Sequence, residues 1–258
     1  MRQTTFKEQD HFERHTTWAE KAHEKFLRKL TESLTERHRA SLLRGLITAS
    51  QSSVILGYTL GNAISQIQSN AKQLIDDVLL YINETDANLT KEKGLEWYIN
   101  CLWYLSFCYF FDISKDKVQT LADHISLTGK DMLIDRLIAA SIPDHPIAIG
   151  KLAFPEVYKP LADALSLDQP QTERNEKILL FLKNYYPLLK KYDVTWHDSH
   201  KEEDPEYCYH FGYWIFELGA LVASIGWDDT AFRNHEFYPK DLVDWKFAQR
   251  LKDQQYRI

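Results

Sequence analysis

The residues best suited to recognition or chemistry lie in the C-terminal part of the sequence. Residues 193–206 read DVTWHDSHKEEDPE, in which a single lysine stands among six carboxylates. These carboxylates are Asp193, Asp198, Glu202, Glu203, Asp204 and Glu206. Runs of charge are usually solvated loops, but a polar loop on a rigid scaffold can also carry recognition. The sequence therefore leaves two interpretations open, a solvated loop or an acidic patch that binds a basic partner.

Metal binding is a further interpretation of the same segment. His197, Asp198 and His200 offer nitrogen and oxygen ligands, but their spacing matches no recognised zinc motif. A fourth ligand, such as His210, would have to come from elsewhere in the fold. We therefore predict no metal site and no cofactor, and keep a metal-dependent enzyme that uses His197 and His200 as an alternative.

Acid–base chemistry is another alternative. His210, Tyr213 and Glu217 are spaced so that one face of a helix could present all three side chains. A buried carboxylate beside a histidine is suited to general acid–base catalysis. However, no GxSxG elbow or phosphate-binding glycine loop accompanies them. We therefore predict no catalytic residues. We interpret Glu217 as a structural anchor paired with an arginine such as Arg136 or with helix-end amides, because a lone buried charge is costly.

Helices must position these residues. Apolar residues recur at helical spacing over 12–34, 38–60 and 63–83, and the aromatic run over 92–111 favours a buried helix. The stretch 207–225 is apolar on nearly every face, which is typical of a buried helix. No alternating strand pattern is evident. The predicted fold is all-α, with helical N-terminal and C-terminal halves packed into one compact body around a buried apolar helix near 207–225.

Glycine and proline mark where these helices end or begin. Gly226 can end the helix near 207–225, Asp228 or Asp229 can cap the next helix, and Pro239 stands where a further helix can begin. Residues 141–160 contain four prolines and predict a connector with little regular structure. We predict two domains, an N-terminal helical domain at 1–128 and a C-terminal helical domain at 129–258.

The net charge of −6 is spread unevenly. Residues 129–258 contain 21 Asp and Glu against 16 Lys and Arg, a balance of −5, whereas residues 1–128 contain 16 against 15, a balance of −1. An acidic half argues against direct binding to nucleic acid and fits a basic protein partner. The N-terminus has no apolar core of a signal peptide, and no apolar run is long enough to span a bilayer. We therefore expect a cytoplasmic protein without a membrane partner; the sequence leaves open whether it forms homo-oligomers.

Several stretches of the sequence resemble a known family. GYWIFELGALVASIGWDDTAFRNHEFYPKDLVDW, which ends at Trp245, resembles the C-terminal hallmark of the PoNi family, immunity proteins to polymorphic nuclease effectors. GYTLGNAISQIQ is similar to the signature of the family's N-terminal domain, and YINCLWYLSFCYFFDI and GKDMLIDRLI are similar to the stretches around the junction. The hallmark is mostly core aromatics and helix punctuation, so it identifies the scaffold. We predict structural roles for Tyr213, Trp214, Glu217, Asp228, Asp229, Tyr238, Pro239 and Asp241.

The resemblance implies an α-helical protein without catalytic activity that binds a cognate toxin, commonly a DNase released in interbacterial competition. Such an effector and immunity pair resembles a toxin and its antitoxin, with the effector delivered by a secretion system. Our hypothesis is a cytoplasmic DNase inhibitor that binds its basic toxin directly. The six carboxylates of 193–206 are its predicted contact residues, and a helical adaptor for another protein is the remaining alternative.

Overall fold

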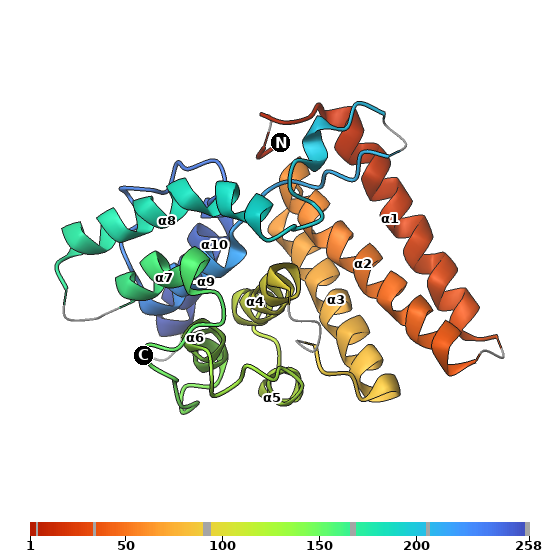
Figure 1. The fold of residues 1–258 in the computed structure, drawn as a ribbon, viewed down its shortest axis with the longest axis horizontal. Helices are drawn as coiled ribbons and strands as arrows, with labels where there is room; N and C mark the ends of the chain where they lie inside the picture. The colour runs from red at the N-terminus through yellow and green to blue at the C-terminus, as the bar shows by residue number, and fades with distance from the viewer. Residues whose placement is uncertain (4, 33–34, 90–93, 166–168, 205–206, 256–258) are drawn as a thin grey trace. The chain divides into compact units, whose positions relative to one another are not determined.

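The regular elements of the protein are helices. The computed structural model describes residues 1–3, 5–32, 35–89, 94–165, 169–204 and 207–255, and within these ranges it contains no β-strand (Figure 1). The all-α prediction is therefore confirmed. The chain forms two compact units: unit 1 comprises Met1–Asn88 and Asp198–Tyr213, and unit 2 comprises Leu89–His197 and Trp214–Ile258. Our domain boundary at residue 128 stays a prediction.

Unit 1 is built from three long helices and a returning segment. They are α1 (Gln9–Leu30), α2 (Glu36–Leu60) and α3 (Ile64–Thr85), joined by the short 3₁₀ helix η1 (Ser199–Lys201) from the C-terminal part of the chain. Helix α2 packs against both α1 and α3 and lies between them (Figure 1). It ends at Gly61, whose backbone is left-handed at φ 88°, a conformation that favours glycine.

Unit 2 contains the remaining helices. They are α4 (Leu95–Phe110), α5 (Lys115–Asp123), α6 (Met132–Ser141), α7 (Pro155–Ala164), α8 (Gln171–Lys191), α9 (Phe216–Ile225) and α10 (Lys240–Gln255). Helix α9 packs on α4, α6 and α10, and α7 packs on α8. The aromatic helix α4 buries most of its side chains, including Trp103, Phe107 and Phe110. The cysteines Cys101, Cys108 and Cys208 are buried free thiols.

The predicted helix near 207–225 is wrong in its first half. Only residues 216–225 form a helix, whereas 207–215 are irregular. Tyr213 in this irregular stretch pairs with Gln3: the Tyr213 amide donates to Gln3 Oε1 at 2.8 Å, and Gln3 Nε2 donates to the Tyr213 carbonyl at 2.5 Å. These long-range bonds satisfy buried backbone groups that a helix would otherwise satisfy internally.

The predicted connector at 141–160 is also wrong in part. It is irregular up to residue 154, but α7 begins at Pro155 and runs through Pro160. Proline at the first helical position costs no hydrogen bond, because the amide there has no partner within the helix. The proline that suggested a break therefore starts a helix.

Candidate partner-binding surface

The acidic segment is divided between the two units. Asp193 lies in unit 2, where it is exposed. Asp198 and residues 202–204 lie in unit 1, and Glu206 lies outside the described residues. We use the name acidic segment for 198–204, the described part in unit 1. Together with Glu206, this stretch carries five carboxylates and one lysine, a balance of −4, so it accounts for nearly all of the −5 of residues 129–258.

The acidic segment exposes its carboxylates. Asp198 is left-handed at φ 60° and forms an ion pair with Lys201 at 2.8 Å across η1. Glu202, Glu203 and Asp204 are exposed, and Glu202 Oε1 accepts the Asp204 amide at 3.0 Å. Such exposed groups are within reach of a cation of a partner, and their attraction to it offsets the hydration that they lose in the interface.

Unit 1 holds the acidic segment by its flanks. Lys7 Nζ donates to the Glu202 carbonyl at 2.8 Å, and Thr59 Oγ1 donates to the Phe211 carbonyl at 2.8 Å. His11 Nε2 donates to the His210 carbonyl at 2.7 Å. The segment is thus fastened to the N-terminal residues, α1 and α2, and its side chains extend from a fixed backbone.

Four histidines of unit 1, one of them within the acidic segment, lie close together: His11, His15, His200 and His210, which we call the histidine cluster. The rings of His11 and His15 have centroids 4.4 Å apart, and those of His200 and His210 are 5.8 Å apart. His11 and His15 cannot be recognised as neighbours of His210 from the sequence, because they lie nearly 200 residues away and no local motif joins them. Only the tertiary fold brings them together.

Burial lowers the pKa of three members of the histidine cluster, His11, His15 and His210. His210 is buried, its Nδ1 shares a hydrogen bond with Ser199 Oγ at 3.1 Å, and its Nε2 has no partner among the described residues. Burial, reinforced by the neighbouring histidines and Lys7, lowers the pKa of His210 to about 3. Burial and the adjacent His11 lower the pKa of His15 to about 4. A charged imidazole is therefore strongly disfavoured here.

The predicted acid–base arrangement of His210, Tyr213 and Glu217 on one helix is wrong. His210 and Tyr213 lie in the irregular stretch of unit 1, where the Tyr213 hydroxyl lies 2.8 Å from His200 Nδ1. Glu217 lies on α9 in unit 2 and is fully buried. The three side chains are thus not presented together by one element.

Glu217 is hydrogen-bonded to its own backbone amide in the first turn of α9, which is one of the two kinds of partner that we expected. Its carboxylate accepts hydrogen bonds from Tyr158 OH at 2.8 Å and Trp103 Nε1 at 3.1 Å, so the suggested pairing with Arg136 is wrong. Burial raises the pKa of Glu217 to about 7, although these hydrogen bonds act in the opposite direction. A carboxyl group enclosed by two aromatic donors ties α4, α7 and α9 together and presents no surface to a substrate.

The two histidines considered as metal ligands, His197 and His200, belong to different units. His197 lies in unit 2, where its ring packs on Tyr186 with centroids 4.5 Å apart, while His200 belongs to unit 1. In the described part of the chain, no group of three or more His, Cys, Asp or Glu side chains is arranged to hold a metal ion.

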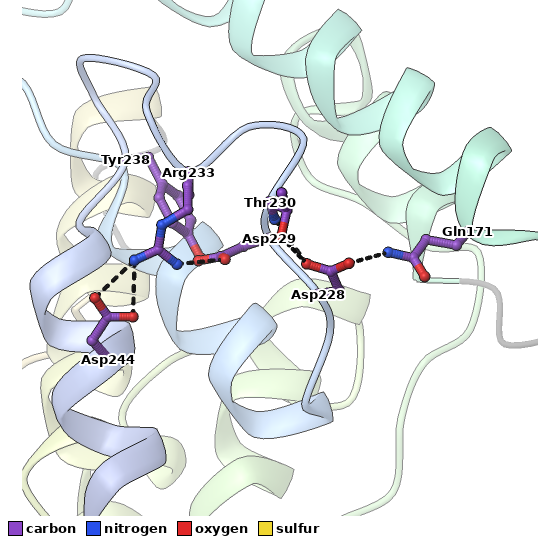
Figure 2. Close-up of polar contacts among 7 residues, drawn as sticks. All are labelled: Gln171, Asp228, Asp229, Thr230, Arg233, Tyr238 and Asp244. Atoms are coloured by element: carbon purple, nitrogen blue, oxygen red, sulfur yellow. Dashed lines mark hydrogen bonds and ion pairs between the residues drawn. The ribbon is translucent and has the colours of Figure 1, made fainter.

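The prediction that Asp228 or Asp229 caps a helix is wrong, because no helix begins directly after them. Residues 226–239 form turns, and the two adjacent carboxylates have different partners (Figure 2). Asp228 is exposed, accepts the Thr230 amide at 2.9 Å, and accepts Gln171 Nε2 of α8 at 3.0 Å. These hydrogen bonds, chiefly that from the Thr230 hydroxyl, lower the pKa of Asp228.

Asp229 is buried and is hydrogen-bonded within the turn segment, which Arg233 links to α10. It accepts Arg233 NH1 at 2.7 Å and Tyr238 OH at 3.0 Å, and Arg233 in turn binds Asp244 of α10 at 2.8 Å (Figure 2). Hydrogen bonds to Asp244 and Asp229 raise the pKa of Arg233, so the guanidinium stays charged. The network fixes the turns of 226–239 against α10.

The other hallmark residues pack around α9 and α10. Trp214 and Pro239 are buried, and α10 begins directly after Pro239 with Asp241 in its first turn. A Cβ at Gly219 of α9 would lie 2.6 Å from Pro239 Cγ, so the glycine permits the close approach of the two segments. The structural roles that we predicted for the hallmark residues stay predictions.

Comparison with known proteins supports the resemblance. Residues 129–242 match the family model for the C-terminal domain of PoNe immunity proteins (PoNi). Among solved structures, protein PA2201 from Pseudomonas aeruginosa has a similar fold, with a TM-score of 0.65 and 17% identity, covering 92% of this chain and 88% of that chain. A search of curated proteins gave no significant match. None of the helices in the described part of the chain combines the length and the apolar character that a membrane span requires.

Proposed function

We propose that this chain, whose residues 129–242 match the family model of the PoNe immunity proteins, is an inhibitor that binds a cognate nuclease toxin directly and protects the cell that produces it. The family supports an immunity protein to a polymorphic nuclease effector and a role without catalysis. The direct complex, the DNase activity of the toxin, its delivery by a secretion system and a cytoplasmic site of action are parts of the proposal.

The observation that carries the proposal is the acidic segment. Glu202, Glu203 and Asp204 are exposed on a backbone that unit 1 holds in place. A nuclease binds the phosphates of its substrate through lysine and arginine. An exposed run of carboxylates on a fixed backbone offers these cations an alternative partner, and opposite charges also accelerate encounter.

Inhibition would then follow from competition for the same surface. The immunity protein covers the basic, DNA-binding face of the toxin, and its carboxylates take the places of phosphates. Because the complex is stoichiometric, one immunity protein protects the cell from one toxin molecule. No metal or cofactor takes part in this mechanism.

The test is a DNA cleavage assay with the nuclease encoded beside the gene for this protein. Co-expression should yield a complex that co-purifies through size-exclusion chromatography. Cleavage of plasmid DNA should stop when the immunity protein reaches the molar amount of the toxin. A toxin that remains fully active at equimolar immunity protein, or that does not co-purify, would contradict the proposal. An unrelated DNase that stays active in the same assay controls for sequestration of the DNA.

A further inference from the structure

Unit 2 contains a second charged feature, of opposite sign to the acidic segment. A groove of about 1040 Å³ opens among α6, α7, the start of α8 and the loop before α7. We call it the basic groove, because its described lining includes five cations: Lys130, Arg136, Lys151, Lys159 and Lys177. The basic groove is not evident from the sequence, because its cations are spread over 48 residues of a half whose net charge is acidic.

Little negative charge offsets the cations of the basic groove. Among its described lining residues, Asp163 is the one carboxylate, and it already forms an ion pair with Lys159 at 2.7 Å. Lys130 donates to the Ser126 carbonyl at 3.0 Å, and Lys177 donates to the side chain of Gln169. The groove thus keeps a positive balance of four within a chain of net charge −6. Such a local field attracts an anion.

Arg136 has an unused donor at this groove. Its Nε is buried and has no hydrogen-bond partner among the described residues.

Apolar residues complete the groove. Met132 and Leu165 are buried in its wall, while Ile149 is 80% exposed at its rim. Among the described lining residues there is no aromatic ring on which a nucleic-acid base could stack. An apolar wall beneath lysine and arginine suits a ligand that carries both carboxylates and apolar side chains.

We propose that the basic groove binds an acidic, partly apolar peptide segment of the toxin, as a second contact distinct from the acidic segment. The inference rests on the proposed function, and it assigns opposite charges on the toxin to the two contacts. Specificity would follow, because a wrong nuclease would have to match a basic surface and an acidic segment together.

The test measures toxin affinity by isothermal titration calorimetry for a Lys130→Glu/Lys151→Glu variant. The affinity should fall about tenfold or more, because two cations that face carboxylates become anions. A second variant, Ile149→Asp, should also weaken binding, since it removes the apolar rim and adds a negative charge. Ile149 is so exposed that this change leaves the fold intact.

A Lys183→Glu/Lys190→Glu variant is the matched control, because both lysines are exposed on α8 and lie outside the described lining of the groove. An equal loss in this control, or unchanged affinity in the groove variants, would overturn the inference while leaving the proposed function standing. Failure of the unmodified protein to bind would refute both. Binding of a DNA duplex in fluorescence anisotropy, lost in the groove variant, would reassign the groove to phosphate.

Discussion

The two units differ in the polar groups that they mainly bury, histidines in unit 1 and carboxylates in unit 2, although Asp77 of unit 1 and Lys246 of unit 2 are buried too. Unit 1 encloses neutral imidazoles, His11 and His210 above all, and leaves the carboxylates of the acidic segment exposed. Unit 2 encloses carboxylates, among them Glu217 and Asp229, and leaves the lysines of the basic groove near the surface. The difference shows that the formal charge of a segment does not reveal which groups a partner can reach.

The largest effect should come from Glu217. We expect Glu217→Ala to lower the free energy of unfolding by about 4 kcal/mol, because Trp103 Nε1 and Tyr158 OH would lose their acceptor inside the core. Urea denaturation followed by tryptophan fluorescence measures it. Glu217→Gln, which keeps a carbonyl acceptor, is the control and should cost much less. Equal costs for both variants would contradict the role of the hydrogen bonds.

Replacing Asp229 should cost much more stability than replacing the adjacent Asp228. We expect Asp229→Ala to cost about 3 kcal/mol, because it removes the acceptor of the buried Tyr238 hydroxyl and one partner of Arg233. Asp228→Ala should cost far less, since Asp228 is exposed and its partners can turn to water. Thermal unfolding of the two variants provides the measurement. A larger loss for Asp228 would reverse our assignment of the structural carboxylate.

Acidification should affect the two units in opposite directions. The pKa of His210 is about 3 in the folded chain against 6.5 when exposed, so its stability contribution is present above pH 6.5 and is lost as the pH falls towards 3. The loss should reach about 2 kcal/mol at pH 5. The pKa of Glu217 is raised from 4.5 to about 7, so its contribution is present at low pH and is lost as the pH rises through 7. Glu217 alone should therefore add about 2 kcal/mol to the stability of unit 2 between pH 7 and pH 5, against which the lowered pKa of His235 acts.

Hydrogen exchange with mass spectrometry, corrected for the intrinsic effect of pH, separates the two changes. Peptides from 198–213 and the start of α1 should exchange faster at pH 5 than at pH 7, whereas peptides from α4 and α9 should not. The charged groups that act on the cluster are Lys7, Arg14 and the histidines themselves. A His210→Phe variant should show a smaller acceleration in unit 1. If hydrogen exchange at pH 5 were accelerated equally in both units, the predicted opposite effects of acidification would be refuted.

The helices of this fold can be predicted from the sequence better than its buried polar contacts can. Periodic apolar residues predicted α1, α2 and α3 within a few positions, because an amphipathic pattern depends only on local spacing. The prediction of a helix over 207–215 is wrong because the backbone of Tyr213 forms its hydrogen bonds with Gln3, 210 residues away. A local pattern cannot report such a contact.

The same limit applies to the candidate surface. The exposure of Glu202, Glu203 and Asp204 follows from their charge and their lack of apolar neighbours in the chain. By contrast, Asp228 and Asp229 are adjacent in the sequence, and only the placement of Arg233 and Tyr238 makes one of them a core residue. Carboxylates of identical type thus divide into surface and core by tertiary contacts.

The smallest effect on stability should come from the acidic segment, where the effect on binding should be large. We expect Glu202→Lys/Glu203→Lys/Asp204→Lys to change the free energy of unfolding by no more than about 0.5 kcal/mol, as for most surface substitutions. Toxin affinity should fall by a factor of ten or more, since three attractive charges become repulsive. Asp116→Lys/Asp123→Lys/Asp144→Lys, with the same charge change at exposed positions of unit 2, is the control and should retain most of the affinity. Affinity that is unchanged in the first variant would remove the segment from the interface, and a fold that collapses would show that its carboxylates, like those of unit 2, serve the structure.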